Sequence, residues 1–324
     1  MTPTIIIANY DGEEVLRRAL LSIKYSQRPT TFKLCIIDNG STDASKKFLQ
    51  EDIWTLFKEE PKVIDTHTTV LAYPCKQRVD DNPQTPMEKI MGGQEIPVVE
   101  HLSSDNIDVI FLAKNWGYEA GMNIGMTIAK NNDPEGDVIL MGSDVELFSG
   151  CIEEFQRTAD IHPQIGIVCA KLMGNIRGKY FVKAGGFTNE MGHEHITGWD
   201  EDEGVWHDFK EQEWVTFSCV YLRRKMLDEI GYMDMTYHVY FGDNDMCRRA
   251  RQGGWAAVFA PTAKVLHGDG ITVKKVKQRT PKEIWDQNQT EEMGYACHKW
   301  ADEEIPYPIL PEGTFDEANT WLGR

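Results

Sequence analysis

Long apolar runs, paired cysteines and an excess of positive charge are all missing from this sequence of 324 residues. No stretch approaches the ~18 apolar residues of a membrane-spanning helix, and the opening MTPTIIIANYDG lacks the basic leader of a signal peptide. The seven cysteines are scattered, without a C-x-x-C pair, which is typical of reduced thiols in the cytoplasm. We therefore expect a cytoplasmic protein without an integral membrane segment.

Acidic residues outnumber basic ones by 51 to 34, which gives a net charge of −17. A surface of this sign repels nucleic-acid phosphates and anionic lipid headgroups, so neither is an expected partner. One basic stretch, Lys274–Lys282, departs from this balance. Its simplest interpretation is a solvated segment.

Signature motifs of several common enzyme classes are also absent. There is no G-x-x-x-x-G-K-[ST] loop, no G-x-G-x-x-G after the first expected strand, no G-x-S-x-G elbow and no H-E-x-x-H helix. The first two absences disfavour a P-loop NTPase and a dinucleotide-binding protein.

Short apolar runs alternate with helical patterns in the first part of the chain. The expected strands cover Thr4–Ala8, Lys33–Asp38, Asp108–Ala113 and Asp137–Met141. The expected helices follow a capping-box pair of Asp11 and Glu14, begin near Ser41 or Thr42, and cover Glu119–Asn131. This alternation predicts an α/β fold with a mostly parallel central sheet flanked by helices.

The alternating pattern fails in two stretches. Residues 59–106, rich in Pro, Gly and polar residues, indicate a long loop or insertion, and residues 185–212 indicate irregular structure. Elsewhere we expect a strand over Glu213–Arg223, helices over Arg224–Ile230 and Asp243–Gln252, and strands over Trp255–Ala260 and Ala263–His267. Residues 271–324 are expected to form an extension that wraps the outside of the domain.

Three polar residues stand where expected strands end, which is where ligands bind in open α/β sheets. These residues are Asp38, Asp144 and His267. A carboxylate and an imidazole at neighbouring strand ends can together hold a divalent cation and leave positions for a diphosphate. Each also has a structural alternative, because an Asp after a strand commonly caps a helix or forms a turn.

Asp243 and Asp245 open an expected helix, where acidic side chains meet the positive end of the helix dipole favourably. Capping explains one of them but does not readily explain both. Residues two apart on a helix point about 200° from one another, so only one can readily face a neighbouring cleft. We expect one carboxylate to cap the helix and the other to act as a general base.

Several motifs follow one another along the chain. They are Asn9-Tyr10-Asp11-Gly12, Asp38-Asn39-Gly40-Ser41-Thr42-Asp43, a segment with Asn115, Gly117, Gly121 and Asn123, Gly142-Ser143-Asp144, the helix start with Asp243, Asp245 and Arg249, and the late His267. In this order they resemble the inverting GT-A-fold glycosyltransferases of family 2, especially the rhamnosyltransferase-like branch, over residues 3–58 and 107–270. The resemblance implies a GT-A domain over residues 1–270, with a nucleotide-sugar half at about 1–150, an acceptor half at about 151–270 and an insertion at about 60–105.

The resemblance further implies a metal-dependent transfer, with inversion, of a sugar from a nucleotide-diphosphate donor of the UDP, dTDP or GDP type to a hydroxyl acceptor such as a saccharide. Asp144 and His267 would bind Mn²⁺ or Mg²⁺. Asp243 would be the catalytic base, with Asp245 and Arg249 in support. The residues that would bind the nucleotide sugar are Ala8, Tyr10, Asp11, Asp38, Asn115, Gly117, Gly121, Asn123 and Ser143.

The sequence departs from the family pattern at several places. Gly242 stands where the family has the first acidic residue of an E-D pair, so the role of that side chain is lost or supplied from elsewhere. The D-x-D motif is reduced to Ser143-Asp144, which leaves one sure carboxylate for the metal. His193 and His195 resemble a zinc pair, but without a third spaced ligand a lid loop over His195–Gly198 is the favoured interpretation.

Two other functions stay open. A nucleotidyltransferase would share the sheet and the metal, but it usually carries a Gly-rich, basic loop after the first strand, where this chain has the acidic Tyr10–Glu14 turn. A catalytically inactive sugar- or nucleotide-binding relative is made conceivable by Gly242. The retained Asp144, Asp243 and His267 argue against that second alternative.

Overall fold

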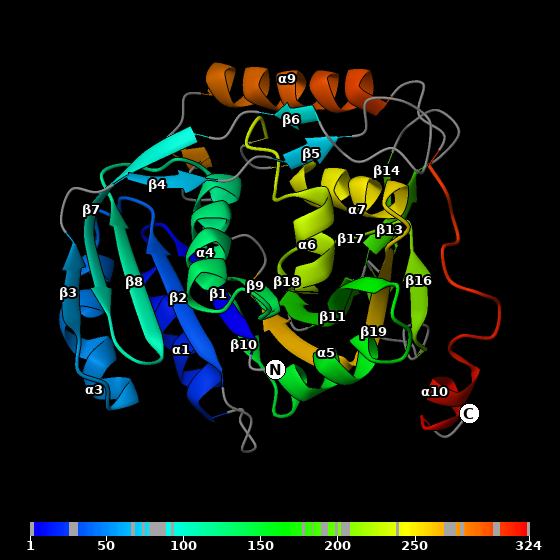
Figure 1. Cartoon of the computed structure of the whole chain (residues 1–324), viewed down its shortest axis with the longest axis horizontal. Helices are drawn as coiled ribbons and strands as arrows, with labels where there is room; N and C mark the ends of the chain where they lie inside the picture. The colour runs from blue at the N-terminus through cyan, green and yellow to red at the C-terminus, as the bar shows by residue number, and fades with distance from the viewer. Residues whose placement is uncertain are drawn as a thin grey trace.

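The fold is seen in a computed structural model of the chain (Figure 1). The structure describes residues 3–25, 32–65, 69–72, 75–77, 89–91, 94–176, 179–183, 185–188, 194–197, 200–201, 208–237, 240–268, 277–278, 282–300 and 305–322.

The middle of the molecule is a parallel sheet. Strand β1 (Thr4–Asn9) lies between β2 (Lys33–Asp38) and β9 (Val138–Gly142), and β8 (Ile107–Leu112) pairs with β2 on its other side. These four strands are nearly continuous buried runs, as expected for parallel strands covered on both faces. Because they are parallel, their carboxyl ends meet at one edge of the sheet, where Asn9 is in register with Asp38.

Further strands widen the sheet on both sides of this parallel centre. Next to β9 the order is β18 (Cys219–Leu222), β11 (Ile165–Ile176), β19 (Ala256–His267) and β10 (Val145–Leu147), and next to β8 it is β7 (Gln94–Ser103) and β3 (Lys62–Asp65). These strands join antiparallel, except that β11 and β19 are parallel. The short strands at the periphery are β4 (Thr69–Ala72), β5 (Cys75–Gln77), β6 (Lys89–Met91), β12 (Lys179–Lys183), β13 (Gly185–Thr188), β14 (Glu194–Thr197), β15 (Asp200–Glu201), β16 (Lys210–Gln212) and β17 (Trp214–Val215).

Helices cover both faces of the sheet (Figure 1). One apolar core includes α1 (Glu13–Tyr25), α3 (Ile53–Phe57) and α5 (Cys151–Ala159), and a second includes α4 (Tyr118–Asn132), α6 (Arg224–Ile230) and α7 (Gly242–Gln252). The short α2 (Ser45–Lys47) and a π-helix (Phe48–Asp52) lead into α3. The α/β architecture predicted from the sequence is therefore confirmed, including the buried stripe of α1 formed by Val15, Leu16, Ala19, Leu20 and Ile23.

The C-terminal part contributes α9 (Lys282–Trp300) and α10 (Asp316–Thr320). Helix α9 crosses the top of the view in Figure 1, above α7, and it buries Trp285 and Trp300. The sequence pattern gave no indication of this long helix.

Two stretches expected to be irregular contain strands instead. Residues 59–106 include β3 to β7, and β7 buries Ile96 and Val98 against β8. Pro97 and a bulge between Val98 and Glu100 interrupt the alternation of this strand, which explains why its pattern was missed. Residues 185–212 likewise include β13 to β16.

Three expected element boundaries are also wrong. The strand expected over Glu213–Arg223 is split into β17 and β18 by a turn at residues 217–218. The two strands expected between Trp255 and His267 are the single strand β19, which continues through Pro261 with a shift of register against β11. The helix expected near Ser41 begins at Ser45, because the preceding residues are engaged by Asp11 and Asp38.

No helix in the described part of the chain is both long and apolar enough to cross a membrane. Within the same residues, Cys35, Cys151, Cys169, Cys219 and Cys247 are buried free thiols, and Cys297 is an exposed one.

Candidate active site

The turns after β1 and β2 are fastened to each other at the carboxyl edge of the sheet. The Asp11 carboxylate accepts hydrogen bonds from the backbone N–H groups of Thr42 (2.5 Å) and Asp43 (3.0 Å). In return, the Asp43 carboxylate accepts one from the N–H of Glu13 at the start of α1 (3.2 Å). Asp11 is 1% exposed, so in this structure it shapes the loop that would face a nucleotide.

Asp38 is equally buried. Its carboxylate accepts hydrogen bonds from the Asn9 side chain (3.3 Å) and the Ser41 backbone (3.2 Å). Burial raises the pKa of Asp38 although these hydrogen bonds favour the ionised form. Ala8 near the end of β1 and Tyr10 directly after it are partly exposed, so they are better placed than Asp11 and Asp38 to meet a ligand directly.

The turn before α4 is held by Asn39, whose position in the sequence gives no sign of this role. Its side chain accepts a hydrogen bond from the N–H of Trp116 (2.9 Å) and donates one to the carbonyl of Gly117 (2.8 Å). Gly117 has a φ of 92°, which an L side chain rarely adopts, and its N–H donates to the Asn115 side chain (2.8 Å). These contacts fix the N-terminus of α4 at the carboxyl edge of the sheet. The free N–H groups of a helix N-terminus bind anions.

Two predicted donor-binding residues within α4 serve packing in this structure. A Cβ atom on Gly121 would lie 3.1 Å from the Cβ of Ala8, so this glycine lets α4 approach β1 closely. Asn123 is fully buried, and its amide donates to the carbonyl of Met233 (2.8 Å) and accepts from the Met233 N–H (3.0 Å). Asn123 thus joins α4 to the segment that precedes α7.

The two predicted metal ligands lie next to each other. Asp144 follows β9 and His267 ends β19, and the pairing of β10 with β19 puts His267 opposite Val145. The His267 Nε2 atom lies 3.7 Å from the Asp144 Oδ1 atom, and both side chains keep limited solvent exposure (12% and 9%). Ser143, which is buried, precedes them. The described residues contain no group of three or more His, Cys, Asp or Glu side chains arranged for a metal ion, so a cation here would take its other ligands from a bound molecule or water.

Asp243 lies in the first turn of α7 and is partly exposed. Its Oδ1 atom accepts a hydrogen bond from the N–H of Asn244 (2.9 Å). Burial, together with the charges of Glu119, Asp243 and Asp144, raises the pKa of Tyr118 well above its usual value. The first turn of α4 lies next to both regions. The Tyr118 hydroxyl donates to the carbonyl of Phe217 (2.8 Å), and the next carbonyl, that of Ser218, accepts from the N–H of Gly142 two residues before Asp144 (2.8 Å). A Cβ atom on Gly242, the residue before Asp243, would lie 2.6 Å from the Glu119 carboxyl.

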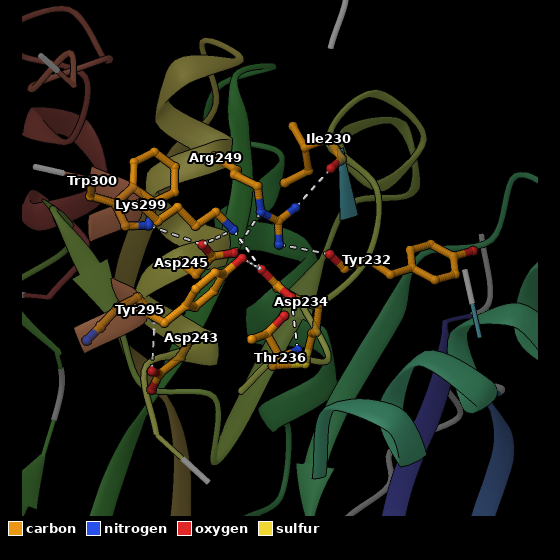
Figure 2. A network of polar contacts seen from close by, with 12 residues as sticks. Ile230, Tyr232, Asp234, Thr236, Asp243, Asp245, Arg249, Tyr295, Lys299 and Trp300 are labelled. Carbon is orange, nitrogen blue, oxygen red and sulfur yellow. Dashed lines mark hydrogen bonds and ion pairs between the residues drawn. The ribbon is translucent and has the colours of Figure 1, made fainter. Parts of the chain in front are cut away.

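Asp245 has entirely different surroundings, shown in Figure 2. It is 1% exposed, and its carboxylate forms ion pairs with Arg249 (2.8 Å) and Lys299 (2.6 Å) and accepts a hydrogen bond from the indole of Trp300 (3.2 Å). The expectation that Asp245 acts mainly by capping the helix is therefore wrong. Its partners Lys299 and Trp300 come from α9, which no spacing around residue 245 could have revealed.

The network continues from Lys299 to Asp234, in the segment between α6 and α7 (Figure 2). Burial opposes ionisation of Asp234, but the charge and hydrogen bond of Lys299 outweigh it and hold the pKa of Asp234 at about 2. Arg249 in turn donates to the carbonyls of Ile230 (2.9 Å) and Tyr232 (2.8 Å). Helix α7 is thus fixed to α9 and to the preceding loop by buried charges that are all paired.

The possible zinc pair cannot be placed in this site, because His193 lies outside the described residues. Of the expected lid loop, His195–Thr197 belong to strand β14, which pairs with β13, and Gly198 lies outside the described residues. What the described residues bring together is a carboxylate beside an imidazole, a helix N-terminus and a partly exposed carboxylate on α7. This combination can hold a cation with an attached phosphate and can accept a proton close by.

Comparisons with known proteins agree with the sequence resemblance. The model of the family described as glycosyl transferase family 2 matches residues 4–69. N-acetylglucosaminyl-diphospho-decaprenol L-rhamnosyltransferase of Mycobacterium tuberculosis, found in strains CDC 1551 / Oshkosh and ATCC 25618 / H37Rv, is 26% identical over 183 residues. The aligned region covers 50% of this chain and 59% of the relative, so the match spans less than two thirds of the relative's length.

Among solved structures, the mannosyltransferase PcManGT from Pyrobaculum calidifontis, in complex with GDP-Man and Mn²⁺, superposes with a TM-score of 0.54 at 12% identity and covers 99% of this chain and 72% of that one. S. aureus TarS gives a TM-score of 0.43 at 15% identity, over 83% of this chain and 58% of that one. The predicted GT-A fold and the resemblance to family 2 glycosyltransferases are therefore both confirmed.

Proposed function

We propose that this chain is an inverting glycosyltransferase that moves a sugar from a nucleotide-diphosphate donor to a hydroxyl acceptor. The observation that carries the proposal is the pairing of Asp144 with His267 at 3.7 Å at the carboxyl edge of the sheet, where the first turn of α4 also contacts Gly242, the residue before Asp243. The similarity to family 2 glycosyltransferases and to a rhamnosyltransferase supports the reaction class.

The donor would be a UDP, dTDP or GDP sugar bound along the carboxyl edge of the sheet. Tyr10 and Ala8 would meet the nucleotide, with Asp11 and Asp38 holding the loops behind them. The N-terminus of α4, aimed by Asn39, would face the negatively charged part of the donor. Solved structures of similar fold contain GDP-Man or UDP-GlcNAc, which are donors of this kind.

Asp144 and His267 fit a divalent cation, because a carboxylate oxygen and a neutral imidazole are both ligands of Mn²⁺, and the oxygen suits Mg²⁺ as well. A cation held there would offset the charge that develops on the leaving diphosphate. The similar mannosyltransferase structure contains Mn²⁺.

The protein's own contribution to the chemistry would come from α7. The Asp243 carboxylate takes the proton of the acceptor hydroxyl while the acceptor oxygen attacks the anomeric carbon from the face opposite the diphosphate. Asp245 and Arg249 support this step by fixing the first turn of α7. Holding donor and acceptor in line supplies a large further part of the acceleration.

The acceptor would be a saccharide or another glycan precursor. The rhamnosyltransferase that this chain resembles is named for an N-acetylglucosaminyl-diphospho-decaprenol acceptor, which favours a sugar hydroxyl. A nucleotidyltransferase and an inactive binding protein are the alternatives, and neither needs a base at Asp243.

The proposal is tested by incubating the purified chain with a panel of nucleotide sugars, with Mn²⁺ or Mg²⁺ and with EDTA, and measuring release of the nucleoside diphosphate. We expect release from at least one donor and its loss in EDTA. Asp144→Asn should abolish the Mn²⁺ stimulation while leaving the melting temperature nearly unchanged, because the substituted side chain has the same size and stays at the edge of the sheet. Calorimetric titration of His267→Ala with Mn²⁺ and the nucleotide should show weaker binding than wild type. Full activity in EDTA, or release of pyrophosphate from a nucleoside triphosphate, would contradict the proposal.

A further inference from the structure

Glu119, in the first turn of α4, carries a buried carboxyl group that nothing so far explains. The residue is 2% exposed, and its Oε2 atom has no hydrogen-bond partner. Buried acids are usually paired, because an unpaired one costs several kcal/mol. A side chain kept at such a cost is a candidate for function.

The carboxyl of Glu119 lies against the backbone of Gly242, the residue directly before the proposed base. A Cβ atom built on Gly242 would lie 2.6 Å from Glu119 Oε1 and 3.2 Å from Glu119 Cγ. Any side chain at position 242 would therefore compete with Glu119 for the same space. Gly242 is also the position at which the sequence lacks an acidic residue next to Asp243.

Glu119 lies in a buried and acidic environment. Burial raises the pKa of Glu119 well above its usual value, and the charges of Glu292, Asp243 and Asp234 raise it further. Asp243 is the more exposed of the pair. These surroundings favour the neutral form of the Glu119 carboxyl group.

We propose that Glu119 supplies, from α4, the acidic partner that is missing at position 242, and that it positions Asp243 for its reaction with the acceptor. This inference rests on the proposed function. In the reaction, the O–H bond of the acceptor breaks, its proton goes to Asp243, and its electron pair forms the new glycosidic bond as the bond to the diphosphate breaks. Glu119 takes no part in this proton transfer and is a positioning residue.

The proposal also explains why the acid comes from α4. The first turn of this helix begins at the Gly117 turn, where the donor is expected to bind. A carboxyl at Glu119 thus connects the donor side of the site with the base on α7. A change in the donor-binding turn would therefore change the position of Asp243 through the contact of Glu119 with Gly242.

The first test is Glu119→Met, which fills a similar volume without a carboxyl group. Removing a buried unpaired acid should leave the melting temperature equal to or above that of wild type. We expect kcat to fall by about tenfold or more, as misplacement of a reacting group does, with the KM for the nucleotide sugar nearly unchanged. A wild-type kcat in this variant would overturn the inference.

The second test moves the carboxyl from one helix to the other. Gly242→Glu alone should lower the melting temperature, because the new side chain meets Glu119. Combined with Glu119→Ala, it should melt near wild type and recover kcat to within about threefold of it. The matched control, Glu119→Ala with Gly242→Met, refills the space without an acid and should stay as slow as Glu119→Met. If the control recovers as well as the carboxyl swap, Glu119 acts only by packing and the inference is wrong.

If the wild-type chain itself transfers no sugar from any donor, it is the proposed function that fails.

Discussion

Asp243 and Asp245 are two residues apart on α7 and have opposite environments, one partly exposed and one enclosed by Arg249, Lys299 and Trp300. Asp243→Asn should lower kcat by roughly 10²–10⁴-fold, the range for loss of a general base, with donor binding and melting temperature nearly unchanged. Asp245→Asn should instead destabilise the protein by about 3 kcal/mol, because it leaves buried cations incompletely paired.

Single-turnover kinetics and thermal melts of both variants separate the two roles. If Asp245→Asn abolished the chemistry at full stability while Asp243→Asn kept its rate, the base would have to be reassigned. Loss of a helix cap alone would cost ~1 kcal/mol. The larger value expected now follows from partners that lie on α9.

Lys299 is the cation that two buried carboxylates share, at 2.8 Å from Asp234 and 2.6 Å from Asp245. Lys299→Met should lower the free energy of unfolding by about 3–5 kcal/mol, because it leaves the buried carboxylates of Asp234 and Asp245 without this cation. Lys130→Met is the matched control. It removes an equally short pair with Asp228 that is 41% exposed on both sides, and it should cost less than about 1 kcal/mol. Urea denaturation measures both values, and equal effects would mean that burial of the network is unimportant.

At the scale of elements, the contact between α4 and β1 depends on the absence of a side chain. A Cβ atom on Gly125 would lie 2.2 Å from the Cγ2 atom of Ile6, so Gly125→Ala should destabilise by about 1–3 kcal/mol. Gly294→Ala on α9 is the control, because a Cβ there meets nothing within 4 Å, and it should stabilise by about 0.5–1 kcal/mol through helix propensity. Chemical denaturation of both variants tests this, and a stable Gly125→Ala protein would show that the two elements can move apart.

The elements that the sequence predicts correctly are those whose pattern is local. The buried runs of β1, β2, β8 and β9, and the apolar stripe of α1, follow from periodicity within one segment. The strand β7 was missed because a proline and a bulge break its alternation. Helix α9 was missed for a related reason, since its exposed and buried residues do not form one simple apolar stripe.

The residues of the candidate site also divide into those whose contacts could be predicted from the sequence and those whose contacts could not. Asp144 and His267 could be predicted to meet, because both stand at strand ends of one sheet. The clamp formed by Asn39 and the contact of Glu119 with Gly242 could not, since each joins residues far apart in the sequence through side-chain geometry.

At the scale of the whole molecule, Asp234 contributes to the response to acid. Its pKa in the folded protein, about 2, lies below the value of about 3.9 in an unfolded chain. Its contribution to stability, about 2 kcal/mol, is therefore fully present above pH ~4 and is lost as the pH falls from ~4 to ~2. Melting temperatures across this range should show a smaller acid-induced fall for Lys299→Met than for wild type, because the variant no longer lowers the pKa of Asp234. If the melting temperatures of the two proteins fell by the same amount with pH, the role of Asp234 and Lys299 in acid stability would be wrong.

The anchoring of α7 by α9 has a consequence for the order of events during synthesis. Trp300 lies 55 residues after Asp245 in the sequence, and at ~5–20 residues per second the ribosome needs roughly 3–11 s to make that stretch. In that interval Asp245 has Arg249 as a partner but neither Lys299 nor Trp300. A nascent chain can therefore complete its central sheet and present Asp243 before the turn that carries this carboxylate is locked. Translation that stops between His267 and Lys299 would release a chain with every proposed catalytic group and without the last anchor that holds them in place.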